Sequence, residues 1–440
     1  MFDTAILVGK KIAFTTLGCK LNFAESSSLA NKLREYGATN VNKGEVADIC
    51  VINTCTVTDV ADRKGRQAIN RIVRENPGAL VVVTGCYAQL QHNNISQIPG
   101  VNLVIGAEHK NQVIPMILSA LHDNETYGDY EVTMAADNPQ FFHACSFGDR
   151  TRYFLKVQDG CNYFCTYCTI PFARGRSRNG SIESIVEQAR KVAKNGGKEI
   201  VLTGVNIGDF GRSTGEDFFQ LIKQLEEVEG IDRYRISSIE PNLLTDEIID
   251  FCANSKTFMP HFHIPLQSGS DEVLHLMRRR YDIKFFEEKI KKVKEYMPHA
   301  FIGVDVMVGC RGEKPEFFQQ AYDFIDSLDI SHVHVFTYSE RPGTDALNIP
   351  YVVDSAEKHE RCQRLIELSD KKTVGFYKHF QGTVRPVLFE HSHNNRIMAG
   401  FTDNYIRVET PARQEMYNTI QNVNLGELNA KGDALRGIVV

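Results

Sequence analysis

Cys161-Asn-Tyr-Phe-Cys165-Thr-Tyr-Cys168 holds three cysteines at the spacing CxxxCxxC. Three thiolates can hold three irons of a 4Fe-4S cluster and leave the fourth iron open to another ligand. The strand-like run 153–157 ends just upstream, and the end of a strand is the usual place for a site in an α/β protein. Structural zinc is the alternative, but zinc prefers four closed ligands, and no second CxxC or HxxxH pair follows.

A second set of cysteines recurs in the first hundred residues, each just after a short apolar run rich in β-branched residues. The set is Cys19, Cys55 and Cys86, after the runs 11–18, 48–54 and 79–85. Such runs are typical of buried parallel strands. Right-handed helical crossovers over 23–36 and 59–75 would place the strand ends at one edge of the sheet. One such cysteine is usually structural, but the repetition predicts a second three-thiolate cluster.

Length and composition predict an intracellular enzyme of two or three domains. The chain has 440 residues, more than one core usually serves. Its 11 cysteines, an odd number, indicate reduced thiols in a cytosol. The apolar stretch 5–9 is too short for a signal peptide, and no run of about 18 apolar residues could span a membrane. The formal net charge of -5 argues against a globally basic nucleic-acid coat.

Basic residues nevertheless gather in three local clusters. They are Arg63, Lys64, Arg66, Arg71 and Arg74 after Cys55, then Arg174, Arg176 and Arg178 after the CxxxCxxC motif, and finally Arg278, Arg279 and Arg280. One such cluster is usually a solvated helix face. Three clusters beside cysteine-bearing loops predict a footprint for a phosphate backbone. Arg174, Arg176 and Arg178 are the candidate contacts to RNA or substrate.

The middle of the chain alternates strands with helices. The expected strands begin at Tyr153, Glu199, Tyr234, His261, Phe301 and His332. Six units are too few for a closed eight-stranded barrel and predict a partial (β/α)6 barrel with its site at the C-terminal strand ends. Those ends, such as 203–206 and 267–270, are polar or rich in glycine. Turn chemistry is one explanation, but the repetition favours a ligand site.

The pattern changes again near residue 374, where short alternating strands predict a small OB-like β-barrel. Arg385, Arg396, Tyr405 and Arg407 favour RNA contact there, with a packing module as the alternative. The predicted fold class is therefore α/β. It comprises an N-terminal parallel-sheet domain over 8–122, a linker over 123–149, the barrel core over 150–373 and the small β-barrel over 374–440.

These motifs together resemble the radical S-adenosylmethionine (SAM) methylthiotransferases over essentially the whole chain. The matching segments are Thr16-Leu-Gly-Cys19-Lys-Leu-Asn22, Asn53-Thr-Cys55-Thr-Val-Thr58, Thr84-Gly-Cys86-Tyr-Ala-Gln89, Ile170-Pro-Phe-Ala-Arg-Gly175 and Pro265-Leu-Gln-Ser-Gly-Ser270. The resemblance implies that Cys161, Cys165 and Cys168 carry a 4Fe-4S cluster that binds SAM. It implies that Cys19, Cys55 and Cys86 carry an auxiliary 4Fe-4S cluster that supplies sulfur, and that the C-terminal barrel is a TRAM domain.

Within the family, several segments resemble the branch that acts on threonylcarbamoyladenosine next to the tRNA anticodon. They are Ile170 to Arg178, Leu202 to Asn206, Ser237 to Pro241 and Met277 to Tyr281. The threonylcarbamoyl group carries a carboxylate that Arg174 or Arg176 could pair with bidentately, whereas an isopentenyl group would prefer an apolar pocket. Gly309-Cys310-Arg311-Gly312 departs from the usual Gly-Phe-Pro-Gly, and Cys310 is not expected to be a ligand.

The resemblance implies that SAM is used twice. One SAM methylates a sulfur of the auxiliary cluster, and reductive cleavage of another yields a radical that removes hydrogen from carbon 2 of the adenine, which takes up the methylthio group. The implied partners are the tRNA anticodon stem-loop and an external electron donor of the flavodoxin or ferredoxin type, in the cytoplasm and without a membrane.

Four residues are candidates for binding SAM. Tyr167 would contact its adenine, with packing against the loop backbone as the alternative. Gly196, Gly197 and Glu199 would approach its methionine end, although the glycines could simply end the preceding helix.

The sequence alone leaves several other functions open. Isopentenyladenosine in tRNA and an aspartate of a ribosomal protein are alternative substrates within the family. A two-cluster electron-transfer protein would need neither six barrel units nor an RNA-binding tail. An RNA-binding protein with structural zinc would hold about one zinc per cysteine set in place of roughly four irons. The other cysteines, Cys50, Cys145, Cys252 and Cys362, have no spacing partner and are expected to be structural.

Overall fold

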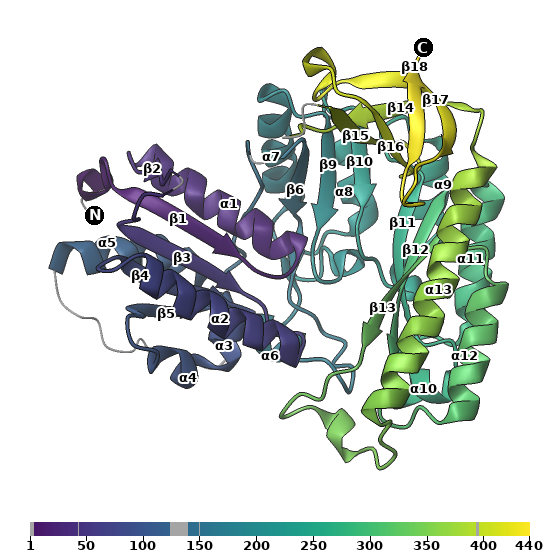
Figure 1. The fold of residues 1–440 in the computed structure, drawn as a ribbon, viewed down its shortest axis with the longest axis horizontal. Coiled ribbons are helices and arrows are strands. Elements are labelled where there is room, and N and C mark those ends of the chain that lie inside the picture. Colours follow the sequence, from purple (N-terminus) through teal and green to yellow (C-terminus); the bar gives the residue numbers. More distant parts are fainter. Residues whose placement is uncertain (1–3, 43, 124–139, 149, 393–395) are drawn as a thin grey trace. The chain divides into compact units, whose positions relative to one another are not determined.

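The computed structural model describes residues 4–42, 44–123, 140–148, 150–392 and 396–440 (Figure 1). Its contacts divide the chain into two units. Unit 1 comprises Met1–Asp149, Phe154–Phe164 and Cys168–Gly180, and unit 2 comprises Arg150–Tyr153, Cys165–Tyr167 and Ser181–Val440. Most of the predicted linker over 123–149 lies outside the described residues.

Unit 1 is built on a five-stranded parallel sheet in the order β2-β1-β3-β4-β5. The strands are β1 (Lys11–Thr16), β2 (Thr39–Asn40), β3 (Ile49–Thr54), β4 (Leu80–Gly85) and β5 (Leu103–Gly106). All six residues of β3 are buried, because its two faces contribute to different cores. Val51 packs on one side with Leu33 and Ile117, and Ile52 packs on the other with Ile69. This alternation explains the continuous apolar run of the sequence.

The described residues of unit 1 contain six α-helices. These are α1 (Lys20–Glu35), α2 (Asp59–Glu75), α3 (Cys86–Leu90), α4 (His92–Ser96), α5 (Val113–Asp123) and α6 (Ile170–Arg174). The hydroxyl of Thr58 caps α2 by accepting a hydrogen bond from the backbone N–H of Ala61. Unit 1 also contains an antiparallel pair, β7 (Gln158–Asp159) with β8 (Arg178–Asn179). This pair closes the base of the loop that holds the CxxxCxxC motif.

The predicted six-stranded barrel core is confirmed as two three-stranded sheets, β10-β9-β6 and β11-β12-β13. The strands are β6 (Arg152–Lys156), β9 (Glu199–Thr203), β10 (Arg233–Ile236), β11 (His261–Gln267), β12 (Phe301–Val308) and β13 (His332–Thr337). Parallel bridges from Tyr234 to Phe258 and from Ser238 to His263 join the two sheets. The sheets therefore form one open barrel, whose ligand sites are expected at the C-terminal strand ends.

The helices of the barrel core alternate with these strands. They are α7 (Ile182–Lys194), α8 (Phe218–Glu226), α9 (Asp246–Asn254), α10 (Asp271–Leu276), α11 (Ile283–Tyr296), α12 (Pro315–Ser327) and α13 (Ser355–His379). Side chains of Ser181, Asp217, Thr245 and Asp282 accept hydrogen bonds at the N-termini of α7, α8, α9 and α11. These caps explain why the helices begin where they do.

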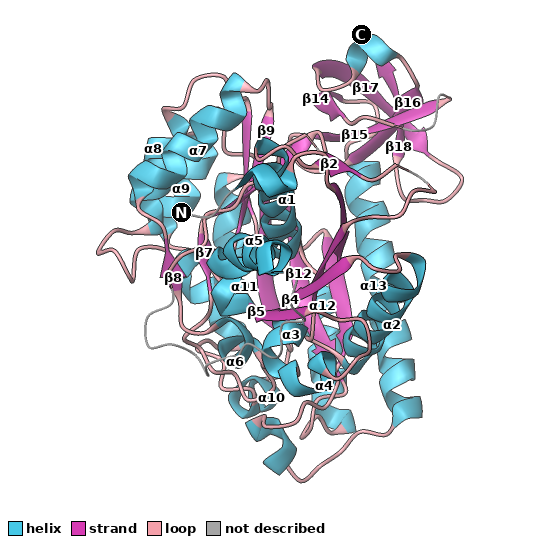
Figure 2. Ribbon diagram, turned by 90° about the vertical axis from the view of Figure 1, so that its left-hand side faces the viewer, coloured by secondary structure: helices cyan, strands magenta, loops and turns pink. Residues whose placement is uncertain are grey.

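Unit 2 ends in a closed five-stranded barrel, which confirms the predicted OB-like domain. The strands are β14 (Val384–Phe389), β15 (Ile397–Thr402), β16 (Arg407–Pro411), β17 (Ile420–Leu428) and β18 (Leu435–Val439), and Figure 2 shows them curled together near the C-terminus. Val387, Phe389 and Val408 are fully buried in its core. Arg233 and Arg235 of β10 donate to backbone carbonyls of this barrel and fasten it to the core of unit 2.

Candidate functional site

Three cysteines of unit 1 lie at the C-terminal ends of strands in its parallel sheet. Cys19, Cys55 and Cys86 follow β1, β3 and β4 in the sheet. Gly18 has a φ of +105°, and a Cβ there would lie 3.1 Å from Sγ of Cys55. Gly85 has a φ of +104°, and a Cβ there would lie 2.4 Å from a backbone oxygen of β3. Both glycines are therefore needed for the close approach of the cysteine loops.

Neighbouring thiols act on the pKa of both Cys55 and Cys86. Burial, with smaller contributions from Cys86 and Cys19, raises the pKa of the Cys55 thiol to about 11. Burial also raises the pKa of Cys86, while the charges of Arg174 and Lys110 act to lower it. The three cysteines thus follow neighbouring parallel strands at one edge of the sheet, and the nearby cations favour the thiolate form of Cys86.

The guanidinium of Arg174 is buried beside this cysteine set. Its Nε donates a hydrogen bond to Sγ of Cys86 at 3.2 Å. Its Nη1 lies 3.1 Å from Glu25 and 2.8 Å from Asp159, and its Nη2 donates to Asn22. The arginine side chain is 1% exposed, so these contacts replace the water that it has lost. Arg174 therefore joins α1, the β7 segment and a cysteine sulfur.

Further buried cations complete the network around the same two carboxylates. Lys156 pairs with Glu25 at 2.8 Å and with Asp159 at 2.6 Å. Lys110 pairs with Glu25, and Arg178 pairs with Asp159 at 3.1 Å. Burial acts to raise the pKa of Glu25, but the neighbouring cations outweigh it and the pKa falls below its ordinary value. The four cations of this network outnumber its two carboxylates, Glu25 and Asp159. The excess positive charge favours negatively charged thiolates nearby.

The CxxxCxxC loop begins at the end of β7. The backbone N–H of Cys161 donates to the carbonyl of Gly175 at 3.1 Å, and Asp159 of the charge network lies two residues before it. Cys161 and Cys168 are half-buried in unit 1, and Cys165 is buried in unit 2. Three thiols within eight residues form a donor set that suits iron, and the charge network fixes the start of their loop.

Tyr167, predicted to contact SAM, is half-buried in unit 2. It packs against an apolar cluster that includes Val273, Met277 and Cys310. The neighbouring Thr166 donates its backbone N–H to Met277 at 3.2 Å. The contact of Tyr167 with SAM stays a prediction, and Cys310 is buried in the same cluster.

Gly196, Gly197 and Glu199, which are predicted to bind SAM, lie between the end of α7 and the first residue of β9, and their contact with SAM stays a prediction. Gly196 has a φ of +75° where α7 ends, and a Cβ at Gly197 would lie 2.7 Å from the ring of Tyr153. Glu199 is fully buried and accepts a hydrogen bond from Arg235 at 2.8 Å. All three lie at the start of β9, whereas a barrel site lies at its C-terminal end. The two glycines end the helix and allow close packing.

The three arginines predicted to bind RNA have different surroundings. Arg174 and Arg178 are buried and paired with carboxylates, and their contact with RNA or substrate stays a prediction. Arg176 is exposed, and its guanidinium lies 5.3 Å from the ring of Phe164. The sequence pattern cannot separate these roles, because it shows the charge of a side chain without its carboxylate partners.

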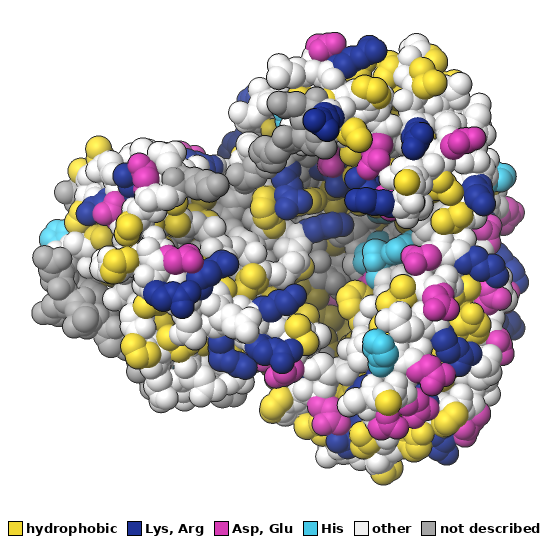
Figure 3. All heavy atoms as spheres, viewed as in Figure 1, with side chains coloured by type: hydrophobic (Ala, Val, Ile, Leu, Met, Phe, Trp, Pro, Cys, Tyr) yellow, Lys and Arg dark blue, Asp and Glu magenta, His cyan; other side chains and the backbone are white. Residues whose placement is uncertain are grey.

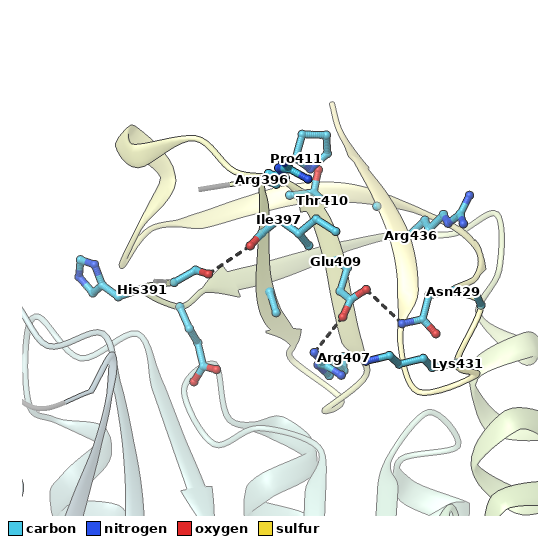
Figure 4. Close-up of a pocket in the computed structure, with 15 residues that line it drawn as sticks. His391, Arg396, Ile397, Arg407, Glu409, Thr410, Pro411, Asn429, Lys431 and Arg436 are labelled. Carbon is cyan, nitrogen blue, oxygen red and sulfur yellow. Dashed lines mark hydrogen bonds and ion pairs between the residues drawn. The ribbon is translucent and has the colours of Figure 1, made fainter. Parts of the chain in front are cut away.

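Two basic surfaces are exposed. The cationic side chains of α2, namely Arg63, Lys64, Arg66, Arg71 and Arg74, are all exposed, and Figure 3 shows Lys and Arg side chains gathered over this part of unit 1. In the C-terminal barrel, a cavity of about 780 Å³ is lined by Arg396, Arg407, Lys431 and Arg436 (Figure 4). Lys431 and Arg436 were not predicted from the sequence, because they lie apart from Arg396 and Arg407 along the chain.

A further polar group lies on neighbouring strands of the barrel core. His263 on β11, Asp305 on β12 and His334 on β13 place their potential ligand atoms within 4.8 Å of one another. Nε2 of His263 lies 2.7 Å from Oδ1 of Asp305. The sequence gives no signal for this group, because its members are about 30 to 40 residues apart and the register of the strands brings them together.

Comparison with known proteins places the chain in a family. Residues 11–106 match the family model described as Uncharacterized protein family UPF0004, and residues 155–325 match the Radical SAM superfamily. The threonylcarbamoyladenosine tRNA methylthiotransferase of Bacillus subtilis (strain 168) is 38% identical over 420 residues, covering 94% of this chain and 93% of that protein. The protein of the same name from Aquifex aeolicus (strain VF5) is 37% identical over 407 residues, covering 92% and 98%.

The chain belongs to the radical SAM methylthiotransferase family. The resemblance seen in the sequence, including the threonylcarbamoyladenosine branch, is confirmed. Among solved structures, the radical SAM methyltransferase TsrM of Kitasatospora setae aligns with a TM-score of 0.56 at 13% identity, covering 77% of this chain and 74% of that chain. At this identity the likeness supports the fold alone. Among the described residues, no helix of this methylthiotransferase is long and apolar enough to cross a membrane.

We expect Glu25→Gln to destabilise unit 1 by about 3–5 kcal/mol near pH 7, because three buried cations lose a shared charged partner. Since folding lowers the pKa of Glu25, its stabilisation is present above its ordinary pKa of 4.5 and is lost as the pH falls toward the lowered value. Hydrogen exchange of β1, β3 and β4 amides measures both effects. Glu35→Gln, at an exposed carboxylate, is the control. Equal opening free energies for the two variants would contradict this role of Glu25.

Proposed function

We propose that this protein is a cytoplasmic tRNA-modifying enzyme that adds a methylthio group to carbon 2 of threonylcarbamoyladenosine next to the anticodon. The observation that carries the proposal is 38% identity to the threonylcarbamoyladenosine tRNA methylthiotransferase of Bacillus subtilis over 94% of the chain. The chain also has two complete three-cysteine sets. The anticodon stem-loop of tRNA is the proposed partner, and an external donor of the flavodoxin or ferredoxin type is the proposed source of electrons.

In this proposal, each of the two cysteine sets holds one 4Fe-4S cluster. Cys161, Cys165 and Cys168 would hold the cluster that binds SAM, since three thiolates leave one iron open. Cys19, Cys55 and Cys86 would hold the auxiliary cluster that supplies sulfur. Bound there, the clusters and SAM would supply the radical and sulfur chemistry that an unactivated aromatic C–H bond requires.

The residues of the protein supply charge and position for that chemistry. Arg174 and Lys110 bring positive charge to Cys86 and favour its thiolate, the form that binds metal. The ion pairs of Asp159 with Lys156, Arg174 and Arg178 fix the strand from which the CxxxCxxC loop starts. In unit 2, the polar C-terminal ends of the barrel strands would receive the modified base once it has left the anticodon stack.

The exposed basic surfaces are the proposed contacts to the tRNA backbone. Arg176 and the five cationic residues of α2 belong to unit 1, and the basic cavity of the C-terminal barrel belongs to unit 2. Arg407 in that cavity is partly neutralised, because it pairs with Glu409 at 2.8 Å and with Asp433 at 2.7 Å. Arg396 and Arg436 are more exposed than Arg407, so their guanidinium groups are accessible to a phosphate.

An anaerobic turnover experiment tests the proposed function. Cluster-loaded protein is incubated with SAM, a reductant and tRNA carrying threonylcarbamoyladenosine, and the digested nucleosides are analysed by mass spectrometry. We expect a methylthio gain on that nucleoside and none on isopentenyladenosine tRNA. A methylthio gain on isopentenyladenosine alone would contradict the proposed substrate. If iron-loaded protein did not cleave SAM, the proposed enzyme class would be wrong.

Variants of the two cysteine sets assign their roles in the same assay. Alanine at Cys19, Cys55 and Cys86 together is expected to leave cleavage of SAM to 5′-deoxyadenosine intact while abolishing methylthio transfer. Alanine at Cys161, Cys165 and Cys168 is expected to abolish both reactions. Cys145→Ala, at a buried cysteine outside both sets, is the control and should keep its iron. Loss of iron in this control would refute the ligand assignment.

We expect Arg396→Ala with Arg436→Ala to weaken binding of tRNA and to reduce the slope of log affinity against log salt by about 1 for each phosphate that the variant no longer binds. Fluorescence anisotropy with labelled tRNA at several salt concentrations measures both quantities. Lys291→Ala, at a 68% exposed lysine on α11, is the matched control. An unchanged salt slope in the double variant would show that this cavity does not bind the tRNA backbone.

A further inference from the structure

A second buried arginine, Arg279, donates to a sulfur of the CxxxCxxC motif. Its Nη1 lies 3.2 Å from Sγ of Cys165, and both residues belong to unit 2. The side chain of Arg279 is only 2% exposed. An N–H donor that is buried beside a cysteine sulfur makes a specific contact, unlike a surface side chain that approaches the sulfur by chance.

The remaining donors of Arg279 hold its guanidinium in place. Nη2 pairs with Glu240, and both Nε and Nη2 donate to the hydroxyl of Tyr281, at 3.1 and 3.0 Å. That hydroxyl in turn donates to the carbonyl oxygen of Pro265 at 2.7 Å, near the end of β11. The guanidinium is thus held between a carboxylate and a phenol, with Nη1 directed at the sulfur.

The burial and the partners of Arg279 differ from those of its two neighbours in sequence. Arg278 is 58% exposed at its side chain and pairs with Asp345, and Arg280 is exposed. The run of three arginines was predicted to contact a phosphate backbone. Its middle member cannot do so, because its side chain is buried and its donors are directed to Cys165, Glu240 and Tyr281.

We propose that Arg279 is a positioning residue that fixes the sulfur of Cys165 and raises the reduction potential of the cluster held by this loop. The proposal rests on the proposed function, which assigns that cluster to Cys161, Cys165 and Cys168. Hydrogen bonds to cysteine sulfur stabilise the more negative, reduced state of an iron-sulfur cluster, and outer contacts orient its ligands. Glu240 nearly neutralises the guanidinium, so the effect depends on the directed N–H group more than on net charge.

The test measures the reduction potential of the full chain without relying on turnover. Alanine at Cys19, Cys55 and Cys86 removes the auxiliary set, so one cluster remains to be titrated by electron paramagnetic resonance. Arg279→Met is compared with Arg278→Met, which changes the exposed neighbour. The parent for this comparison is the triple alanine variant with Arg278 and Arg279 unchanged. At the potential where the cluster of the parent is half reduced, we expect the ratio of reduced to oxidised cluster to be at least tenfold lower in Arg279→Met. This corresponds to a reduction potential that is lower by 59 mV for one electron. Arg278→Met should match the parent.

Two further variants keep the proposal testable if Arg279→Met cannot hold iron. Arg279→Lys retains a charged N–H donor and should keep the cluster at an intermediate potential. Glu240→Gln removes the opposing carboxylate and should raise the potential. An iron-loaded Arg279 variant with the potential of the parent would overturn the proposal alone. A parent that binds no 4Fe-4S cluster would overturn the proposed function and this proposal with it, before any Arg279 variant is compared.

Discussion

The ion pairs of Arg174 with Glu25 and Asp159 connect three parts of unit 1 that are distant in sequence. Removing such charges from water costs several kcal/mol per ion, and this cost is offset only when their donors and acceptors find partners in good geometry. Arg174 meets this condition, since its three nitrogens reach Cys86, Glu25, Asp159 and Asn22. Helix α1, the β7 segment and helix α6 are therefore fixed relative to one another, and so is the first residue of the CxxxCxxC loop.

The same network of buried ion pairs affects whether the auxiliary cysteines can bind a cluster. Burial alone disfavours thiolates, as the raised pKa of Cys55 and Cys86 shows, whereas a metal ligand must be a thiolate. The surplus of buried cations opposes this effect at Cys86. A similar arrangement recurs in unit 2, where a carboxylate holds Arg279 against Cys165. In each unit a buried arginine, fixed by a carboxylate, donates to the sulfur of a motif cysteine.

The sequence predicted those parts of the fold that depend on local pattern. The apolar runs before Cys19, Cys55 and Cys86 are strands, and the six strand-and-helix units and the C-terminal barrel are present. It could not predict features that depend on tertiary partners. Arg174 and Arg176 are separated by a single glycine in the sequence, yet one is buried and the other exposed. Polar and glycine residues occur at both ends of a strand, and only the direction of β9 shows that Gly196, Gly197 and Glu199 lie at its start.

The iron content of Arg174→Met, compared with that of Arg176→Met, tests most directly whether the buried charge network supports the auxiliary cysteine set. After anaerobic reconstitution, and with folding checked by hydrogen exchange, Arg176→Met should hold about eight irons, roughly four per cysteine set. Arg174→Met should hold about four, because its auxiliary thiols lose the cation that favours their charged form. A folded Arg174→Met protein with the iron content of Arg176→Met would show that the buried charge network does not support the auxiliary cysteine set.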